Sequence, residues 1–273
     1  MPEKPEVITV SKKLIPQIVH KEITGCSIYW DNIIAYPDSK TFRKNIVGQV
    51  IRDVSTRGKF IVIELDDYSL LVHLRMEGKF FFRYKGEMIT KHDHVELILD
   101  NKISFRFNDV RKFGKMYLIN KTDTYKVPPL SLLGLEFDDE KLTAEYLLDK
   151  IKSKKLPIKT VLLDQSIITG IGNIYDDEVL FMSGINPLKK ACDISKEECD
   201  KIINNTRIVL NKAIKLGGTT IKSFTSSEGV HGLFQNELLV HGKEGSKCPK
   251  CGSVILKTKI NGRGTSYCSK CQK

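Results

Sequence analysis

The C-terminal tail places the strongest constraint on how this chain can fold. It contains two Cys-x2-Cys pairs, Cys248–Cys251 and Cys268–Cys271, with sixteen residues between them. Two such pairs can bring four thiolates into tetrahedral geometry around one zinc ion. Because four cysteines leave no open coordination position, the pattern predicts one structural Zn2+ per subunit and not a catalytic metal. No organic cofactor is expected.

The arm between the two pairs is long enough for a β-hairpin whose apolar residues are Ile255, Leu256 and Ile260. The Asn261-Gly262-Arg263-Gly264 sequence predicts its turn and puts Arg263 at the tip. Taken alone, Arg263 is a solvated turn residue. The remaining cysteines are interpreted as small buried apolar residues; they are Cys26, Cys192 and Cys199.

The rest of the chain is patterned first for strands and then for helices. Pro5 and apolar residues at helical spacing predict a helix over 5–19, and short β-branched and aromatic runs predict a β-rich body over 50–107. Val127-Pro128-Pro129 predicts a domain boundary. Helices are predicted over 141–152, 158–165, 173–182 and 196–216. Gly217-Gly218 ends the last helix, and a Gly/Ser/Thr-rich stretch up to Gly232 predicts a mobile loop.

The charge of the chain indicates a polyanionic partner. The formal net charge is +11, and its basic excess lies in residues 1–130 and 217–273, while residues 131–216 are nearly neutral. The hydrophobic content of 41% excludes wholesale disorder. The N-terminus lacks the apolar stretch of a signal peptide, and no run approaches the ~18 apolar residues of a membrane span. We therefore expect a cytoplasmic protein with no membrane partner.

The first residues suggest a nucleophile. Removal of Met1, expected before a residue as small as proline, would leave Pro2 with a free secondary amine beside Glu3. Such an amine forms a cationic iminium with a carbonyl-like carbon, which is a ready electron sink. The following helix N-terminus favours the neutral amine, and Glu3 could donate a proton. Physical reasoning alone would favour a frayed terminus.

Three motifs decide between these interpretations. They are Met1-Pro2-Glu3-Lys4-Pro5-Glu6-Val7, Thr169-Gly170-Ile171-Gly172-Asn173-Ile174-Tyr175-Asp176-Asp177-Glu178 and the paired cysteines. In this order they closely resemble the bacterial formamidopyrimidine-DNA glycosylases over essentially the whole chain. The resemblance implies an α+β multidomain fold. Its parts are an N-terminal helix with a catalytic β-sandwich (1–128), a helix-two-turn-helix DNA-binding module (129–220), a lesion-recognition loop and linker (221–239) and a β-hairpin zinc finger (240–273).

The resemblance also implies an activity. It is base-excision repair by a bifunctional glycosylase and abasic-site lyase, which removes 8-oxoguanine and formamidopyrimidines from duplex DNA. Pro2 would attack C1′ to form a Schiff base, and Glu3 would protonate the sugar. Lys59 matches the family lysine of β-elimination and Arg263 the arginine of δ-elimination, although Lys59 alone would be a solvated strand-end lysine. A monomer beside the nucleoid in the bacterial cytosol is the simplest expectation.

Further residues match DNA-holding positions of the family. The residues that match its DNA contacts are His92, Arg111 and Lys155. The expected further phosphate contacts are His73, Lys159 and Asn173. Met76, Arg111 and Phe113 match the side chains that fill the gap when the lesion is flipped out. Glu77, Thr219 and Thr220 match lesion-reading elements. The alternatives are core packing for Met76 and Phe113, and a metal site at His92-Asp93-His94.

Three positions depart from the family pattern, none of them catalytic. Lys4 replaces a usual leucine, Val110 a usual proline and His241 a usual tyrosine. Two rival functions stay open. One is an endonuclease VIII-like glycosylase for oxidised pyrimidines, which shares the Pro-Glu start; the other is a non-catalytic zinc-ribbon protein that binds DNA. A cytosolic scaffold that binds no DNA is a third.

Overall fold

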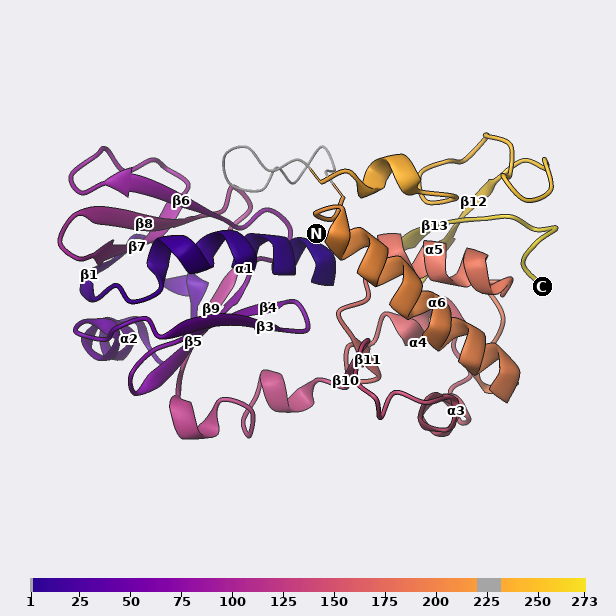
Figure 1. Cartoon of the computed structure of the whole chain (residues 1–273), viewed down its shortest axis with the longest axis horizontal. Coiled ribbons are helices and arrows are strands. Elements are labelled where there is room, and N and C mark those ends of the chain that lie inside the picture. Colours follow the sequence, from indigo (N-terminus) through magenta and orange to yellow (C-terminus); the bar gives the residue numbers. More distant parts are fainter. Residues whose placement is uncertain (1, 220–231) are drawn as a thin grey trace. The chain divides into compact units, whose positions relative to one another are not determined.

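A computed structural model describes residues 2–219 and 232–273 and divides into two compact units. The first unit contains the described residues up to Ser131 together with Thr219 and Gly232, and the second contains Leu132–Gly218 and Leu233–Lys273. Figure 1 follows the chain through both units. Thr220 and most of the predicted loop lie outside the described residues.

The first unit begins with helix α1 (Lys4–Ile18), which confirms the helix predicted from apolar spacing. Pro5 lies in the first turn, where its missing N–H leaves no hydrogen bond unmade. Glu3 and Glu6 form a capping box that satisfies two backbone N–H groups at the helix start. One stripe of α1 is buried in the core of the unit; it contains Val7, Val10, Leu14 and Ile18.

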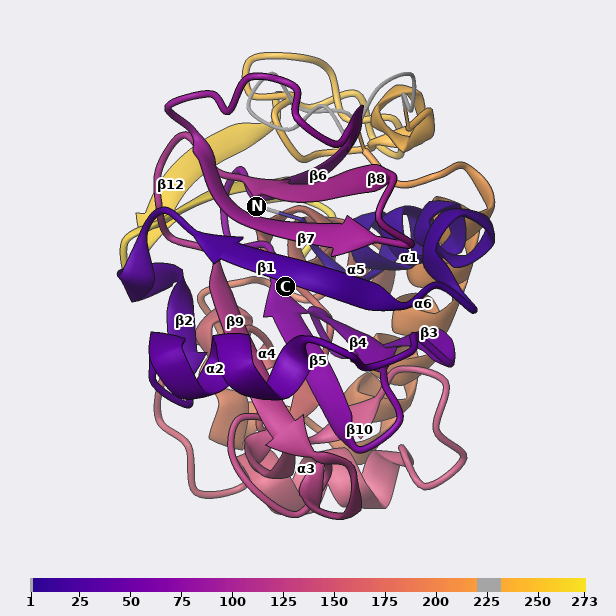
Figure 2. The ribbon, with the colours of Figure 1, turned by 90° about the vertical axis from the view of Figure 1, so that its left-hand side faces the viewer.

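Two sheets complete this unit and share one apolar core with α1 (Figure 2). The first sheet has the order β1 (Ile23–Ile28), β7 (Asp93–Leu99), β8 (Ile103–Asn108) and β6 (Lys79–Tyr84). The second has the order β2 (Ile34–Tyr36), β9 (Lys115–Asn120), β5 (Tyr68–His73), β4 (Phe60–Glu64) and β3 (Asp53–Arg57). All pairs are antiparallel except β2 with β9. The β-rich body is confirmed as a sandwich.

Local sequence explains how the elements of this unit join. Asp100 and Asn101 connect β7 to β8 with positive φ angles of 49° and 57°, which Asp and Asn tolerate better than most residues. Helix α2 (Ser39–Ile46) was not predicted; Asp38 caps it by accepting the N–H groups of Lys40 and Thr41. Short 3-10 turns are η1 (Asp31–Ile33), η2 (Lys121–Asp123) and η3 (Leu130–Leu132).

The second unit contains the four predicted helices around a second core. They are α3 (Ala144–Ile151), α4 (Ile158–Leu162), α5 (Asn173–Ser183) and α6 (Lys196–Lys215). Helix α3 begins later than predicted because the Thr143 hydroxyl caps it by accepting the N–H of Tyr146. Strands β10 (Leu135–Glu136) and β11 (Ile168–Thr169) form a short parallel pair, and 3-10 turns lie at η4 (Ala191–Asp193) and η5 (Phe234–Glu237).

The tail of the second unit forms the predicted hairpin, β12 (Leu256–Ile260) and β13 (Arg263–Tyr267). Asn261 and Gly262 make its turn with positive φ angles. Arg263 therefore does not lie at the tip as predicted; it is the first residue of β13 and pairs with Ile260. Among the described helices, none is long and apolar enough to cross a bilayer.

Candidate functional site

In the first unit, Glu3 and Glu6 organise the N-terminal segment. Glu3 is only 3% exposed, and its backbone N–H donates to Glu6 Oε2 at 2.8 Å. The other Glu6 oxygen, Oε1, accepts the backbone N–H of Thr219 at 2.7 Å and its hydroxyl at 3.1 Å. Glu6 thus connects the chain beside Pro2 to a residue more than 200 positions away. The spacing of Glu3 and Glu6 predicts the capping-box contact, but nothing in the sequence predicts the contact with Thr219.

The departure at Lys4 has a structural explanation. Its ammonium donates to Thr56 Oγ1 at 3.1 Å and approaches the Thr56 carbonyl at 3.4 Å, at the end of β3. A leucine at this position could make neither contact. Lys4 therefore joins the first turn of α1 to the end of β3, the strand that leads into the turn containing Lys59.

Lys59 and His73 lie near each other at the end of the second sheet. Lys59 precedes Phe60, which pairs with His73 across β4 and β5 and meets its ring edge-to-face at 4.7 Å. Lys59 is 6% exposed, so it is not the solvated strand-end lysine that its sequence position allows.

His73 is neutral at ordinary pH. Burial, then the charges of Arg75 and Lys59, lower the pKa of His73 from 6.5 to about 3. Its Nδ1 accepts the N–H of Arg75 at 3.0 Å, which leaves the ring proton on Nε2. A neutral Nε2–H group is a hydrogen-bond donor that a phosphate oxygen can accept.

A tight loop carries Arg111 and Phe113. The Asp109 carboxylate is fully buried and accepts three backbone N–H groups, those of Arg111, Phe113 and Gly114, at 2.9, 2.9 and 2.7 Å. The guanidinium of Arg111 lies 4.8 Å from the centre of the Phe113 ring, and both side chains are exposed. Phe113 is 48% exposed, so core packing is the wrong interpretation for it. Sequence analysis missed Asp109.

Further predicted site residues of the first unit are half-buried, and the two histidines near this loop lie in different environments. Met76 and Glu77 are half-buried in the turn between β5 and β6. His92 is half-buried, whereas His94 is buried and its Nε2 bonds to the Asp109 carbonyl at 2.7 Å. The two imidazoles therefore do not form a metal site with Asp93; among the described residues only the tail cysteines form a metal-binding cluster.

In the second unit, Asn173 and Arg263 come together. Asn173 begins α5, and its Nδ2 donates to the Gly264 carbonyl, next to Arg263, at 3.0 Å. Asn261 Nδ2 donates to Thr160 Oγ1 at 3.0 Å from the other side of the hairpin turn. The positive end of α5 and the exposed Arg263 consequently offer adjacent binding groups for an anion.

The two predicted lysines of this unit behave differently. Lys155 is exposed between α3 and α4. Lys159 is 0% exposed, and its ammonium lies 2.5 Å from Asp177 Oδ1 and 3.8 Å from Asp176 Oδ2. A side chain enclosed in this way cannot reach a phosphate at the surface, so the prediction that Lys159 is a phosphate contact is wrong. The sequence around Lys159 gives no sign of this burial, which the nearby carboxylates of Asp177 and Asp176 compensate.

The four tail cysteines fit one zinc ion. Their sulfur atoms all lie within 4.8 Å of one another, with Cys248 to Cys271 at 3.8 Å and Cys251 to Cys268 at 3.5 Å. Tetrahedral thiolates with Zn–S bonds of about 2.3 Å are separated by about 3.8 Å. The zinc supplies folding energy here, since no coordination position is left for a substrate.

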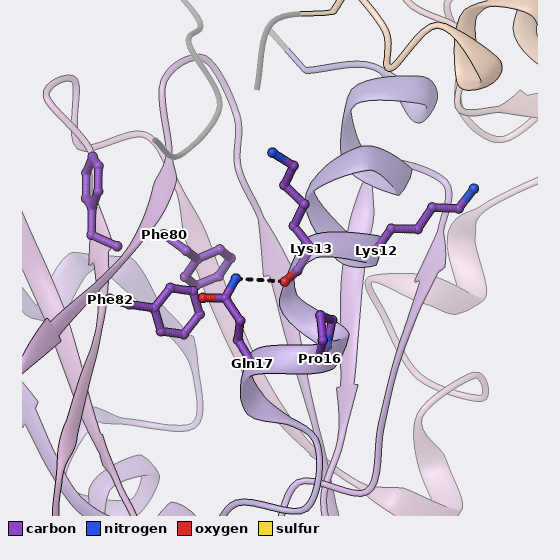
Figure 3. A pocket seen from close by; sticks show the side chains of 7 residues that line it. Lys12, Lys13, Pro16, Gln17, Phe80 and Phe82 are labelled. Carbon is purple, nitrogen blue, oxygen red and sulfur yellow. Dashed lines mark hydrogen bonds between the residues drawn. The ribbon is translucent and has the colours of Figure 1, made fainter. Parts of the chain in front are cut away.

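A hollow of about 440 Å³ lies between α1 and β6 in the first unit (Figure 3). The rings of Phe80 and Phe82 face Gln17, whose Nε2 donates to the Lys13 carbonyl at 2.8 Å. None of the predicted site residues lines this hollow, so it is distinct from the groups described above.

Three family models match successive parts of the chain. They are the formamidopyrimidine-DNA glycosylase N-terminal domain over residues 1–116, the formamidopyrimidine-DNA glycosylase H2TH domain over 133–225, and the zinc finger found in FPG and IleRS over 245–273. Together they span most of the sequence in the order that the motifs indicated.

Relatives match over their whole lengths. A formamidopyrimidine-DNA glycosylase of Oceanobacillus iheyensis is 42% identical over 273 residues, covering 100% of this chain and 98% of that protein. The Lactococcus lactis Fpg bound to DNA containing an abasic site has a TM-score of 0.92 at 35% identity, covering 99% of each chain. MutM bound to DNA containing carbocyclic 8-oxo-G also has a TM-score of 0.92 at 35% identity, with 100% of each chain covered.

Proposed function

Because this chain belongs to the formamidopyrimidine-DNA glycosylase family, we propose roles for its individual residues in the excision of oxidised purines from duplex DNA. The protein is a bifunctional DNA glycosylase and abasic-site lyase of base-excision repair. Its partner is damaged double-stranded DNA, and its zinc is structural. The observation that carries the residue roles is the Pro2-Glu3 pair at the head of α1, in a chain similar to these glycosylases over its full length.

Pro2 is the proposed nucleophile and Glu3 the proposed proton donor. Once Met1 is removed, the Pro2 amine attacks C1′ while the bond from C1′ to the base breaks, and the proton lost by the amine balances the one gained by the departing base. Glu3 then protonates the ring oxygen O4′ as the bond from C1′ to O4′ breaks, which leaves an iminium between C1′ and the Pro2 nitrogen. The resulting iminium draws electrons from the sugar, which permits β- and then δ-elimination of the flanking phosphates. Two features support this assignment: Glu3 is buried, and the amine precedes the positive end of α1.

Lys59 and Arg263 are proposed for the two eliminations. Lys59 is held in the β3–β4 turn, near the residue that Lys4 contacts, which supports a role beside Pro2. Arg263 lies exposed beside the N-terminus of α5, which supports a role at a phosphate.

The DNA-holding roles go to groups that can reach solvent or donate to an anion. We assign phosphate contacts to His92, Arg111, Lys155, His73 and Asn173, without Lys159. Met76, Arg111 and Phe113 are assigned to the gap left by the flipped base, because an exposed cation–π pair on a fixed loop can replace lost stacking. Glu77 and Thr219 are assigned to lesion recognition, together with Thr220 outside the described residues.

Borohydride trapping tests the mechanism. Wild-type protein incubated with an 8-oxoguanine duplex should give a covalent adduct that maps to the N-terminal peptide, and Pro2→Gly should trap poorly. No adduct with wild type, or equal trapping by Pro2→Gly, would refute the Pro2 assignment. A parallel incision panel with oxidised pyrimidines separates this function from an endonuclease VIII-like one. Binding without any incision would indicate a non-catalytic DNA-binding protein.

We also propose that the protein works as a monomer in the cytosol, beside the nucleoid. Light scattering after gel filtration gives the mass, and a fluorescent fusion that fails to follow the DNA in cells contradicts the location. The ranges 1–128, 129–220, 221–239 and 240–273 are the proposed functional modules. Cleavage sites of limited proteolysis would test their limits.

A further inference from the structure

Asp177 in α5 is a buried carboxylate that receives hydrogen bonds from three separate segments. Its Oδ1 lies 2.5 Å from the ammonium of Lys159 in α4. Its Oδ2 accepts Nδ1 of His241 at 2.7 Å and the backbone N–H of Ser266 in β13 at 3.2 Å. The Asp177 side chain is 0% exposed, so solvent does not compete for these bonds.

The neighbouring Glu178 binds the backbone of residues 239–241, before the first zinc-binding cysteine. Its carboxylate accepts the backbone N–H groups of Leu239, Val240 and His241 at 2.8, 3.0 and 2.8 Å. Glu178 therefore fixes the backbone of residues 239–241, which brings the His241 ring to Asp177. Of the two carboxylates, only Asp177 reaches the zinc hairpin itself.

The contact with Ser266 matters because of what β13 carries. Arg263 begins this strand three residues before Ser266, and α5 lies beside β13 in the second unit (Figure 1). Near the hairpin turn the bonds are neutral: Asn173 donates to the Gly264 carbonyl, and Asn261 donates to the Thr160 hydroxyl. Ser266, by contrast, donates to the charged and buried carboxylate of Asp177. Charge-assisted hydrogen bonds are about twice as strong as neutral ones.

His241 donates a further hydrogen bond to Asp177 through the ring nitrogen that lies nearest its backbone. In histidine, Nδ1 is close to the backbone, and here it meets Oδ2 of Asp177 while the main chain of His241 is held by Glu178. A tyrosine hydroxyl lies at the far end of a longer ring and could not occupy the same point from the same backbone. Asparagine, by contrast, places its amide N–H where the imidazole has Nδ1–H.

We propose that Asp177 and His241 are positioning residues for Arg263, which hold β13 against α5 and so set how efficiently δ-elimination follows β-elimination. The inference rests on the proposed role of Arg263. Neither residue touches DNA in this proposal; both act through the strand that presents the guanidinium.

The test is single-turnover cleavage of a duplex with a pre-formed abasic site, with β and δ products measured separately. His241→Leu and Asp177→Asn should slow δ-elimination relative to β-elimination by about tenfold, since small displacements of a catalytic group have effects of this order or larger. Borohydride trapping at Pro2 and the zinc content should stay at wild-type values. His241→Asn should restore the product ratio, because it returns a donor to Asp177.

Two further variants complete the test. Glu244→Gln removes a surface carboxylate that pairs with Lys257 in the same module, and its product ratio should match wild type. Arg263→Gln should slow δ-elimination at least as much as His241→Leu. If Arg263→Gln changes nothing, the proposed role of Arg263 falls, and this inference falls with it. If Arg263→Gln slows the δ step but His241→Leu does not, or His241→Asn fails to rescue, only the positioning inference is refuted.

Discussion

Replacing Asp109 with asparagine should loosen the loop that carries Arg111 and Phe113. The carboxylate accepts one backbone N–H on Oδ1 and two on Oδ2, at 2.7 to 2.9 Å, in a fully buried position. Asparagine has a single acceptor oxygen. If that oxygen keeps the two bonds of Oδ2, the amide nitrogen then faces the N–H of Arg111, and two donors are left opposed.

The magnitude follows from these three bonds. A hydrogen bond to a charged group contributes about 1.5–3 kcal/mol and a neutral one about 1 kcal/mol. The substitution removes one charged bond and converts two others to neutral ones, and water can solvate the N–H of the exposed Arg111. We expect the free energy of unfolding to fall by about 3 kcal/mol. Urea denaturation measures this loss.

Function should respond more selectively than stability. Excision of 8-oxoguanine should fall further than cleavage of a pre-formed abasic site, because an abasic nucleotide has no base to unstack. Asp67→Asn is the matched control; that carboxylate is exposed and accepts from Gln49, so its change should stay within about 0.5 kcal/mol. A loss below about 1 kcal/mol for Asp109→Asn, with both reactions slowed equally, would refute the anchoring role of Asp109.

Three further predictions concern zinc, pH and salt. Removing zinc with a chelator should unfold the hairpin and abolish DNA binding while the unfolding of the β-sandwich stays unchanged, as circular dichroism and a zinc-release assay would report; retained binding contradicts this. The pKa of His73 is 6.5 in the unfolded chain and about 3 in the folded one, so the unfolded state binds more protons between these values and the free energy of unfolding decreases as the pH is lowered. Between pH 7 and pH 5, wild type should therefore lose about 2 kcal/mol more of this free energy than His73→Gln. Lys155→Gln should make the negative slope of log binding constant against log salt shallower by about 0.9. Lys159→Gln should leave this slope unchanged and lower the free energy of unfolding by about 3–5 kcal/mol. An unchanged slope for Lys155→Gln would remove it from the phosphate contacts.

Local sequence was sufficient where the interaction is local. The cysteine spacing predicted a four-sulfur cluster, and apolar periodicity predicted α1 and the four helices of the second unit. Helix ends were predicted less well, since they depend on single side-chain bonds such as the one that Thr143 makes. Helix α2 buries just Phe42 and Ile46, and strand β2 has three residues, so neither element shows a repeated apolar pattern.

The site residues that sequence analysis missed share a different property. Glu6, Asp109 and Asp177 act through partners whose contacts require the folded chain, or through buried backbone N–H groups. Asp109 before a short turn is readable as a turn residue, but its burial is not. The same holds for Lys159, whose enclosure depends on Asp177, 18 residues further on. Pattern reasoning treats a charged residue as solvated unless a charged neighbour in sequence pairs with it. Glu6, Asp177 and Lys159 have partners that are distant in sequence, and Asp109 binds nearby backbone N–H groups that no pattern of side chains shows.

The placement of these carboxylates also explains how a chain with 33 acidic residues can bind a polyanion. Glu6, Asp109, Asp177 and Glu178 are buried, and each accepts at least one backbone N–H group within its own unit. Several basic residues proposed for DNA are exposed instead, as Arg111, Lys155 and Arg263 are. The formal charge of +11 gives buried acids and exposed cations the same weight, although a phosphate at the surface lies closer to the exposed cations. Asp109 holds the loop that carries Arg111, and Asp177 holds the strand that carries Arg263, so in the proposed roles buried negative charge fixes the positions of positive charge.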